Sequence, residues 1–262
     1  MQPLYNLHNH TPFSDGAFTI DEICEAHVDL PDPAVQGLGI CDHLFCTPSS
    51  HAPSNIRDFE RIFLPEAQRY HDQVRDAAKR WEGRLEILCG CEITWSLNRA
   101  FIEQIRGALA NFDFVLFENL DWSGLTQLAS VARRFPCRVG LAHTSVSEQF
   151  PNTPPEQVVR TLANARIFYE LNTKHLPFSP SDPWLRMLPQ HKVTVSIGTD
   201  THDDLSVLGT LRGLAATVER AGLHDRLFTP QPMIRTAAVA ESTSQARPAL
   251  EPQAAAPRAY RR

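Results

Sequence analysis

Seven short apolar runs recur along the chain, and each is followed by a segment with helical character. The runs are apolar throughout rather than alternating, which is typical of strands buried on both faces of a parallel sheet. They occupy residues 4–7, 35–41, 85–93, 112–117, 138–142, 167–171 and 193–197. Strands alternating with helices predict right-handed crossovers and an α/β fold. With seven such units we expect a closed or nearly closed barrel. An open, doubly wound sheet is the alternative.

The segments between the runs carry helix signals. Residues 19–30 open with Thr19-Ile20-Asp21-Glu22, a capping-box pattern ahead of apolar positions. Residues 58–81 place apolar side chains at helical spacing. Further helices are expected over residues 97–110, 124–135, 155–165, 182–190 and 205–221. The last of these is followed by Gly222, a suitable C-terminal cap.

Length and composition predict one domain and a tail. A single α/β barrel of roughly 200–250 residues fits a chain of this size. After about residue 230 the sequence becomes rich in Ala, Pro, Gln, Ser, Thr and Arg, with few apolar anchors. We therefore expect a barrel domain over residues 1–230 and a disordered tail over residues 231–262.

Bulk properties also limit the partners. The formal net charge of -5 argues against a bulk basic surface for binding nucleic acid and leaves a local basic groove open. No apolar run approaches the ~20 residues of a transmembrane helix, and the N-terminus lacks the basic and apolar regions of a signal peptide. The six cysteines form no CxxC pair. We expect a cytoplasmic, reduced protein without a membrane partner, and the sequence sets no oligomeric state.

Polar side chains gather just after the apolar runs. They are His8, His10 and Asp15 after the first run, His43 after the second, Glu92 in the third, Glu118 and Asp121 after the fourth, His143 after the fifth, Glu170 and Asn172 in the sixth, and Asp200 and His202 after the seventh. The carboxyl ends of barrel strands form one rim, and that rim carries the active site in barrel enzymes. The sequence therefore predicts a polar site built from residues far apart in the chain.

The types and spacing of these residues indicate metal ions. In an extended segment, His8 and His10 point to the same side because side chains alternate. Asp200 and His202 repeat this arrangement with one oxygen and one nitrogen donor. Imidazole and carboxylate together suit Zn, Mn or Fe. We expect two or three divalent ions at this rim.

The same residues resemble the PHP (polymerase and histidinol phosphatase) superfamily. The resemblance spans most of residues 4–222 and begins with the segment His8-Asn9-His10-Thr11-Pro12-Phe13-Ser14-Asp15-Gly16. The Asp42-His43, Glu92, His143 and Asp200-Thr201-His202 elements follow in the family's order. The resemblance implies a distorted (β/α)7 barrel and a stand-alone metal-dependent phosphoesterase.

The resemblance also implies a distribution of ligands over three metal sites. It assigns His8, His10, Glu92 and Asp200 to the first ion, and Asp15, His43 and His202 to the second. Glu92 would bridge to a third ion, whose other ligand here is His143. Family members usually supply another histidine after strand four, but residues 117–122 contain none. Glu118 or Asp121 could replace it, or the site could be empty and the protein dinuclear.

The predicted activity is hydrolysis of a small phosphorylated molecule by a metal-activated hydroxide that attacks phosphorus. Lys174 and His175 follow the sixth run and are expected to contact the phosphate, and His175 could protonate the leaving alkoxide. Two alternatives remain: a nuclease acting on nucleotide ends, and a catalytically degenerate metal-binding module. The other histidines, which are His27, His51, His71, His191 and His224, are expected at the surface.

Overall fold

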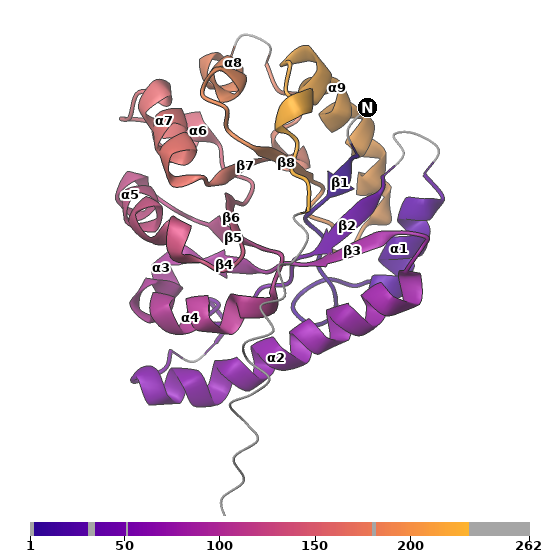
Figure 1. Cartoon of the computed structure of the whole chain (residues 1–262), viewed down its shortest axis with the longest axis vertical. Helices are drawn as coiled ribbons and strands as arrows, with labels where there is room; N and C mark the ends of the chain where they lie inside the picture. The colour runs from indigo at the N-terminus through magenta and orange to yellow at the C-terminus, as the bar shows by residue number, and fades with distance from the viewer. Residues whose placement is uncertain (1–2, 31–34, 51, 180–181, 231–262) are drawn as a thin grey trace, which may run out of the picture. The chain divides into compact units, whose positions relative to one another are not determined.

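The computed structural model describes residues 3–30, 35–50, 52–179 and 182–230 (Figure 1). Its strands run parallel in one sheet of order β3-β2-β1-β8-β7-β6-β5-β4. The strands are β1 Tyr5–Asn6, β2 Gly37–Ile40, β3 Glu86–Cys89, β4 Glu92–Thr94, β5 Phe114–Glu118, β6 Arg138–Leu141, β7 Phe168–Asn172 and β8 Val195–Gly198. The expected tail, residues 231–262, lies outside the described residues.

The third apolar run closes the sheet. It forms both edge strands, β3 beside β2 and β4 beside β5, with only Gly90 and Cys91 between them. Backbone hydrogen bonds continue across this break, from Gly90 N to Ile40 O (2.9 Å) and from Asp113 N to Cys89 O (2.8 Å). The sheet therefore curls round to meet itself. The predicted α/β barrel is confirmed, with the third of the seven expected strands divided in two.

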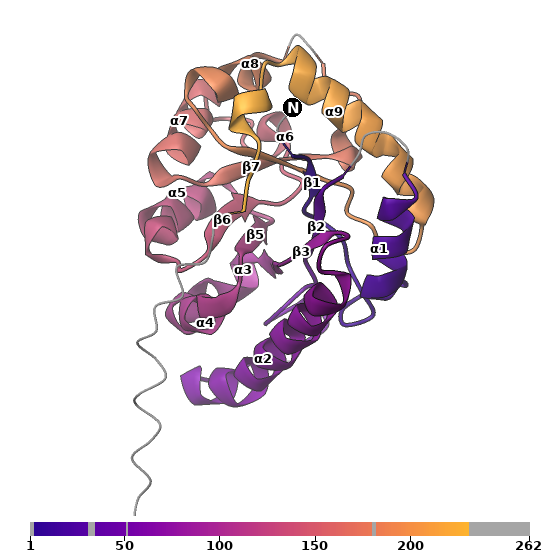
Figure 2. The same cartoon turned by 45° about the vertical axis from the view of Figure 1, so that its right-hand side comes forward.

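The helices lie around the outside of the curled sheet (Figures 1 and 2). They are α1 Ile20–Val28, α2 Ile56–Trp81, α3 Trp95–Asn98, α4 Ile102–Ala108, α5 Trp122–Val131, α6 Val146–Gln149, α7 Pro155–Ala165, α8 Pro183–Gln190 and α9 Leu211–Arg220. Short 3₁₀ turns are η1 Arg99–Phe101, η2 Leu109–Asn111, η3 Ala132–Arg134, η4 Thr173–His175, η5 Leu205–Thr210 and η6 His224–Arg226. The helices expected over residues 97–110, 124–135 and 205–221 are each part α-helix and part 3₁₀ turn, and α6 was not expected.

The longest helix, α2, packs against the outside of the sheet and hydrogen-bonds to the carboxyl ends of two strands. Its buried residues recur every three or four positions, which places them on one face: Phe59, Phe63, Ala67, Tyr70, Val74, Ala77 and Trp81. The Tyr70 hydroxyl donates to the carbonyl of Gly90 (2.9 Å) and accepts from the backbone N–H of Asp42 (3.2 Å). One side chain of α2 thus fixes the end of β2 and the break between β3 and β4.

Aromatic rings fill the inside of the barrel, where they pack directly against glycine residues of the strands. A Cβ atom at Gly39 or Gly90 would collide with the Phe114 ring, and one at Gly140 would collide with Phe168. Both rings pack against Phe228, whose backbone N–H donates to the first residue of β8 (2.7 Å). Apolar side chains therefore fill the barrel towards the amino ends of the strands, and the clustered His, Asp and Glu side chains lie at the opposite end.

One expectation about histidines is wrong. His27 is not a surface residue but is buried, with 2% of its surface exposed. It lies on the inner face of α1, where Nδ1 donates to the carbonyl of Ile23 (2.7 Å) and Nε2 accepts from the Asn6 amide (2.9 Å). His51, another of that set, lies outside the described residues.

All six cysteines are free thiols, and only Cys137 is not fully buried. None of the helices in the described ranges has both the length and the apolar character needed to cross a bilayer.

Candidate metal centre

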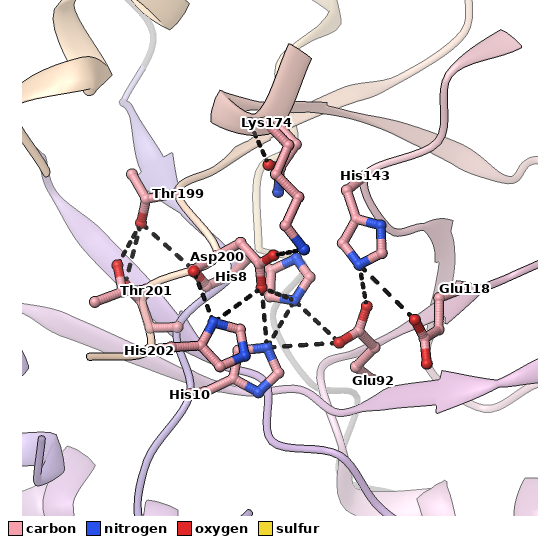
Figure 3. Close-up of polar contacts among 12 residues, drawn as sticks. His8, His10, Glu92, Glu118, His143, Lys174, Thr199, Asp200, Thr201 and His202 are labelled. Carbon is pink, nitrogen blue, oxygen red and sulfur yellow. Dashed lines mark hydrogen bonds and ion pairs between the residues drawn. The ribbon is translucent and has the colours of Figure 1, made fainter. Parts of the chain in front are cut away.

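The residues predicted as metal ligands lie together at the carboxyl ends of the strands. Figure 3 shows His8, His10, Glu92, His143, Asp200 and His202 among them. Their donor atoms form three overlapping groups: His8, His10, Glu92 and Asp200; His10, Asp15, His43 and His202; and Glu92, Glu118 and His143. Within each group the donor atoms all lie within 4.8 Å of one another. All eight predicted ligands are in these groups, and Glu118 joins them. The described part of the chain thus contains clusters that could hold metal ions.

Backbone pairing brings the distant segments into register. The strand extension after β1 meets the extension after β8 through a bridge between Asn9 and Thr201. Asp200 N donates to the carbonyl of His8 (2.9 Å). A second bridge joins His43 to Glu92. Residues nearly two hundred positions apart are therefore placed by main-chain hydrogen bonds rather than by flexible loops.

Two of the candidate ligands have left-handed backbone conformations. The φ angles are 54° at Asp200 and 23° at His143. Such conformations are costly for residues other than glycine, and they cluster where a side chain must be aimed at a functional site. At His143 the surrounding structure holds the strained peptide, because its N–H donates to Glu170 Oε2 (2.6 Å).

The first group has the dimensions of a tetrahedral site. His8 Nε2 lies 3.0 Å from His10 Nε2, and Asp200 Oδ1 lies 3.2 Å from each of them. Glu92 Oε2 is 3.4 Å from the His8 nitrogen and 3.5 Å from the His10 nitrogen. A tetrahedron with metal–ligand bonds of about 2.1 Å has edges of about 3.4 Å. These four donors are therefore spaced as ligands of one ion are.

Glu170 orients the first of these ligands, a role that the sequence pattern does not predict. Its Oε1 accepts a hydrogen bond from His8 Nδ1 (2.8 Å), and both side chains are fully buried. With the hydrogen on Nδ1, His8 presents the lone pair of Nε2 to the cluster. A carboxylate behind a ligating imidazole is a common supporting contact at metal sites. One sequence feature could have indicated this role: Glu170 lies within the sixth apolar run, and a charged side chain buried there without a partner would be costly.

The second group is more exposed and includes the loop after β1. Asp15 Oδ2 lies 3.6 Å from His43 Nε2 and 3.4 Å from His202 Nε2. His10 Nδ1 is 3.3 Å from Asp15 Oδ1, so the hydrogen on this nitrogen points to Asp15 while Nε2 serves the first group. Asp42 fixes the loop by accepting hydrogen bonds from Thr11 and Ser14. Three donors, from Asp15, His43 and His202, thus face one point.

The third group distinguishes two residues that the sequence left as alternatives. His143 Nε2 lies 2.9 Å from Glu92 Oε1 and 3.9 Å from Glu118 Oε2. Asp121 instead caps α5, where its Oδ1 accepts from Gly124 N (2.6 Å). Glu118 therefore occupies the position beside His143, and Asp121 does not.

The electrostatics show that the cluster attracts positive charge. Burial alone would lower the pKa of His8 and His10. The carboxylates around them outweigh it, raising the pKa of His8 well above its usual value and that of His10 to about 9. Burial would raise the pKa of Glu92, but the adjacent His8 and His143 hold it well below its usual range.

A proton on both facing nitrogens of His8 and His10 would place two positive charges 3.0 Å apart. The buried oxygens Glu92 Oε1 and Asp200 Oδ1 have no hydrogen bond of normal geometry within the described ranges. A divalent ion would satisfy both the nitrogen lone pairs and these oxygens, so the donor set fits a metal.

Lys174 and His175, the predicted phosphate-contacting residues, lie on η4 immediately after β7. The Lys174 amino group forms an ion pair with Asp200 Oδ2 and remains half-exposed (Figure 3). His175 Nε2 donates to the carbonyl of His143 (2.8 Å). Lys174 thus reaches the candidate metal centre directly, whereas His175 contacts the backbone beside it.

Comparison with known proteins gives a match in structure only. No family model and no curated protein sequence matches the chain. Histidinol phosphate phosphatase from Lactococcus lactis, solved with zinc, L-histidinol and phosphate, matches with a TM-score of 0.60 and 16% identity, over 87% of this chain and 96% of that one. The chain has the fold of a histidinol phosphate phosphatase. The resemblance to the PHP superfamily is therefore supported at the level of the fold.

Other solved structures match with lower scores. A chain in archaeal ribonuclease P with mature tRNA matches with a TM-score of 0.46 and 13% identity, over 83% of this chain and 87% of that one. Dihydrodipicolinate synthase from Oceanobacillus iheyensis gives 0.37 and 10%, over 85% and 75%. These scores carry no argument about this protein.

Proposed function

We propose that this protein is a metal-dependent phosphoester hydrolase of the PHP type, acting on a small phosphorylated molecule. The observation that carries the proposal is the first donor group, in which two imidazole nitrogens lie 3.0 Å apart and each lies 3.2–3.5 Å from an oxygen of Glu92 and of Asp200, as ligands of one ion do. The shared fold with a phosphatase solved with zinc and phosphate supports it.

Two groups of residues would hold the ions. His8, His10, Glu92 and Asp200 would bind the first, and Asp15, His43 and His202 the second. Zinc, manganese and iron all suit this mixture of nitrogen and oxygen donors. Divalent ions bound there supply acidification of a water molecule to near-neutral pKa and charge stabilisation of phosphate oxygens.

The chain's own residues would hold the substrate and the ligands in place. Lys174 has a half-exposed ammonium group beside Asp200, where it could bind an oxygen of the phosphate. Glu170 keeps His8 in the tautomer that binds metal. His175 Nε2 carries the hydrogen that the His143 carbonyl accepts, so a proton given by His175 to a leaving alkoxide would come from Nδ1.

The test is hydrolysis by protein purified without chelator and supplied with Mn²⁺ or Zn²⁺. We expect turnover of an aryl phosphate by the wild-type protein and loss of both turnover and at least one bound ion in His10→Ala. His191→Ala is the matched control, because His191 follows α8 and leads into the amino end of β8, opposite the candidate centre. Equal rates and metal contents in His10→Ala and wild type would refute the proposal.

The same assay separates the alternatives. Turnover of single-stranded DNA in place of the aryl phosphate would indicate a nuclease. Tight metal binding without turnover of either substrate would indicate a metal-binding module that has lost catalysis.

A further inference from the structure

Asn172, the last residue of β7, has a buried side-chain amide with only one of its two ends paired. The side chain is fully buried, and its Oδ1 accepts from the backbone N–H of Lys174 (2.9 Å). Its Nδ2 has no hydrogen-bond partner among the residues that the structure describes. A buried donor without an acceptor is costly, and native proteins keep few of them. The position of this N–H group therefore indicates where an oxygen of a ligand would be bound.

The alternation of side chains along β7 places the Asn172 side chain inside the barrel. Phe168 packs in the inner apolar cluster, whereas Leu171 belongs to the outer core that the helices cover. Because side chains alternate in a strand, residues 168, 170 and 172 all face inwards. Glu170 contacts His8 from this face. Asn172 lies two residues, or about 6–7 Å, further along the strand, at the rim that carries the candidate metal centre.

The end of β7 thus brings two donors beside the candidate metal centre. The hydrogen bond from Lys174 N fixes the rotation of the Asn172 amide, so Nδ2 cannot turn to another acceptor without uncapping η4. The Lys174 ammonium group is half-exposed and pairs with Asp200 Oδ2. An amide N–H and an ammonium group, separated by one residue in the chain, are therefore available to one bound anion.

The number of terminal oxygens on a phosphate group decides what such donors can bind. A phosphate monoester has three terminal oxygens, and a diester has two. Two metal ions can hold two terminal oxygens while hydroxide attacks the phosphorus. In a monoester the third oxygen is then left to accept from the protein. In a diester that position carries an esterified oxygen, which is a poor acceptor, so the donors at the end of β7 favour a monoester.

We propose that Asn172 Nδ2 donates to the third terminal oxygen of a bound phosphate monoester, beside Lys174, and that this contact makes the enzyme favour monoesters over diesters. The inference rests on the proposed function and names its substrate class. Asn172 binds the substrate and has no part in holding the ions. A hydrogen bond to a charged group contributes about tenfold to a hundredfold in affinity, and its loss should reduce monoester binding by that factor.

The experiment compares the full-length wild-type chain with Asn172→Ser, both loaded with Mn²⁺. Serine keeps an oxygen that can accept from Lys174 N but has no group that reaches as far as Nδ2. Calorimetry measures the affinity for inorganic phosphate, elemental analysis measures bound metal, and kcat/KM is measured with an aryl phosphate and with a diaryl phosphate. We expect unchanged metal content and phosphate affinity weakened by at least about tenfold. The ratio of monoester to diester kcat/KM should fall by a similar factor.

Two further variants make the test specific. Asn172→Asp keeps the size of the side chain and the acceptor for Lys174 N, but it turns an acceptor towards the phosphate. Its phosphate affinity should therefore fall further than that of Asn172→Ser, and it decides the question if the serine variant folds poorly. Asn164→Asp is the matched control, because Asn164 is exposed near the end of α7, which leads into the amino end of β7. Its phosphate affinity should stay within about twofold of the wild type.

Three results would overturn the inference and leave the proposed function in place. The first is an unchanged phosphate affinity in both Asn172 variants, as expected if the amide donates only to a buried water molecule. The second is an equal loss of monoester and diester turnover, or a loss of metal, since either indicates a structural role. The third is a wild-type protein that hydrolyses the diester as efficiently as the monoester. Absence of metal-dependent turnover of either ester by the wild type would instead contradict the proposed function itself.

Discussion

Replacing Glu170 by Gln tests whether the carboxylate that hydrogen-bonds to His8 and His143 raises the metal affinity of the site. The carboxylate accepts two hydrogen bonds, from His8 Nδ1 (2.8 Å) and from His143 N (2.6 Å). A glutamine has one carbonyl oxygen, so it can accept only one of them and turns an N–H group towards the other. Loss of such a supporting partner lowers metal affinity by about 10–100-fold, or about 1.4–2.7 kcal/mol.

The measurement is competition between the protein and a chelator of known affinity for the tightest ion. The matched control is Glu156→Gln, which removes an exposed carboxylate paired with Arg160 on α7 and should change neither metal affinity nor stability by more than about 0.5 kcal/mol. Thermal unfolding of metal-free protein shows whether Glu170→Gln is folded. A folded variant with wild-type metal affinity would refute the role assigned to Glu170.

Three further predictions concern other parts of the structure. Lys174→Met should raise KM for an aryl phosphate, or the Ki of inorganic phosphate, by about tenfold while metal content is unchanged, and an unchanged Ki would remove Lys174 from the substrate site. Burial lowers the pKa of His27 from 6.5 to about 4, so its contribution to stability is present above pH 6.5 and is lost as pH falls towards 4. Between pH 6.5 and pH 4, the free energy of unfolding of the wild-type protein should therefore fall by about 3 kcal/mol more than that of the His27→Gln variant, as measured by chemical denaturation. An equal pH dependence of the two proteins would contradict the buried, neutral state of His27. Gly198→Ala would place a methyl group against the Glu170 carboxylate and His8 Cβ, and should cost about 1–3 kcal/mol of unfolding free energy and weaken metal binding; wild-type values of both would show that the packing there adapts.

Much of the candidate centre was predictable because strand geometry is regular. His8 and His10 must share a side in an extended segment, and parallel strands bring their carboxyl ends to one rim. The same regularity predicted the α/β barrel from the apolar runs. It did not reveal that the third run divides at Gly90. That division arises because the first part of the run, β3, pairs with β2, whereas the second part, β4, pairs with β5.

The features that the sequence did not reveal depend on contacts between distant residues. Glu170 meets His8 across a separation of 162 positions, and nothing near either residue indicates the pair. Glu118 and Asp121 are equivalent from sequence, since both follow the same strand. Only the start of α5 shows that Asp121 is a cap. His27 had the appearance of a surface residue, and its burial follows from the face of α1 that packs on the sheet.

The most direct test of the metal centre is anomalous diffraction from crystals of the protein grown with Mn²⁺ and measured on both sides of the manganese edge. We predict one strong peak among His8, His10, Glu92 and Asp200 and another among Asp15, His43 and His202, separated by about 3.5–4 Å. Crystals of folded protein with no peak at either group would contradict the assignment of a metal centre.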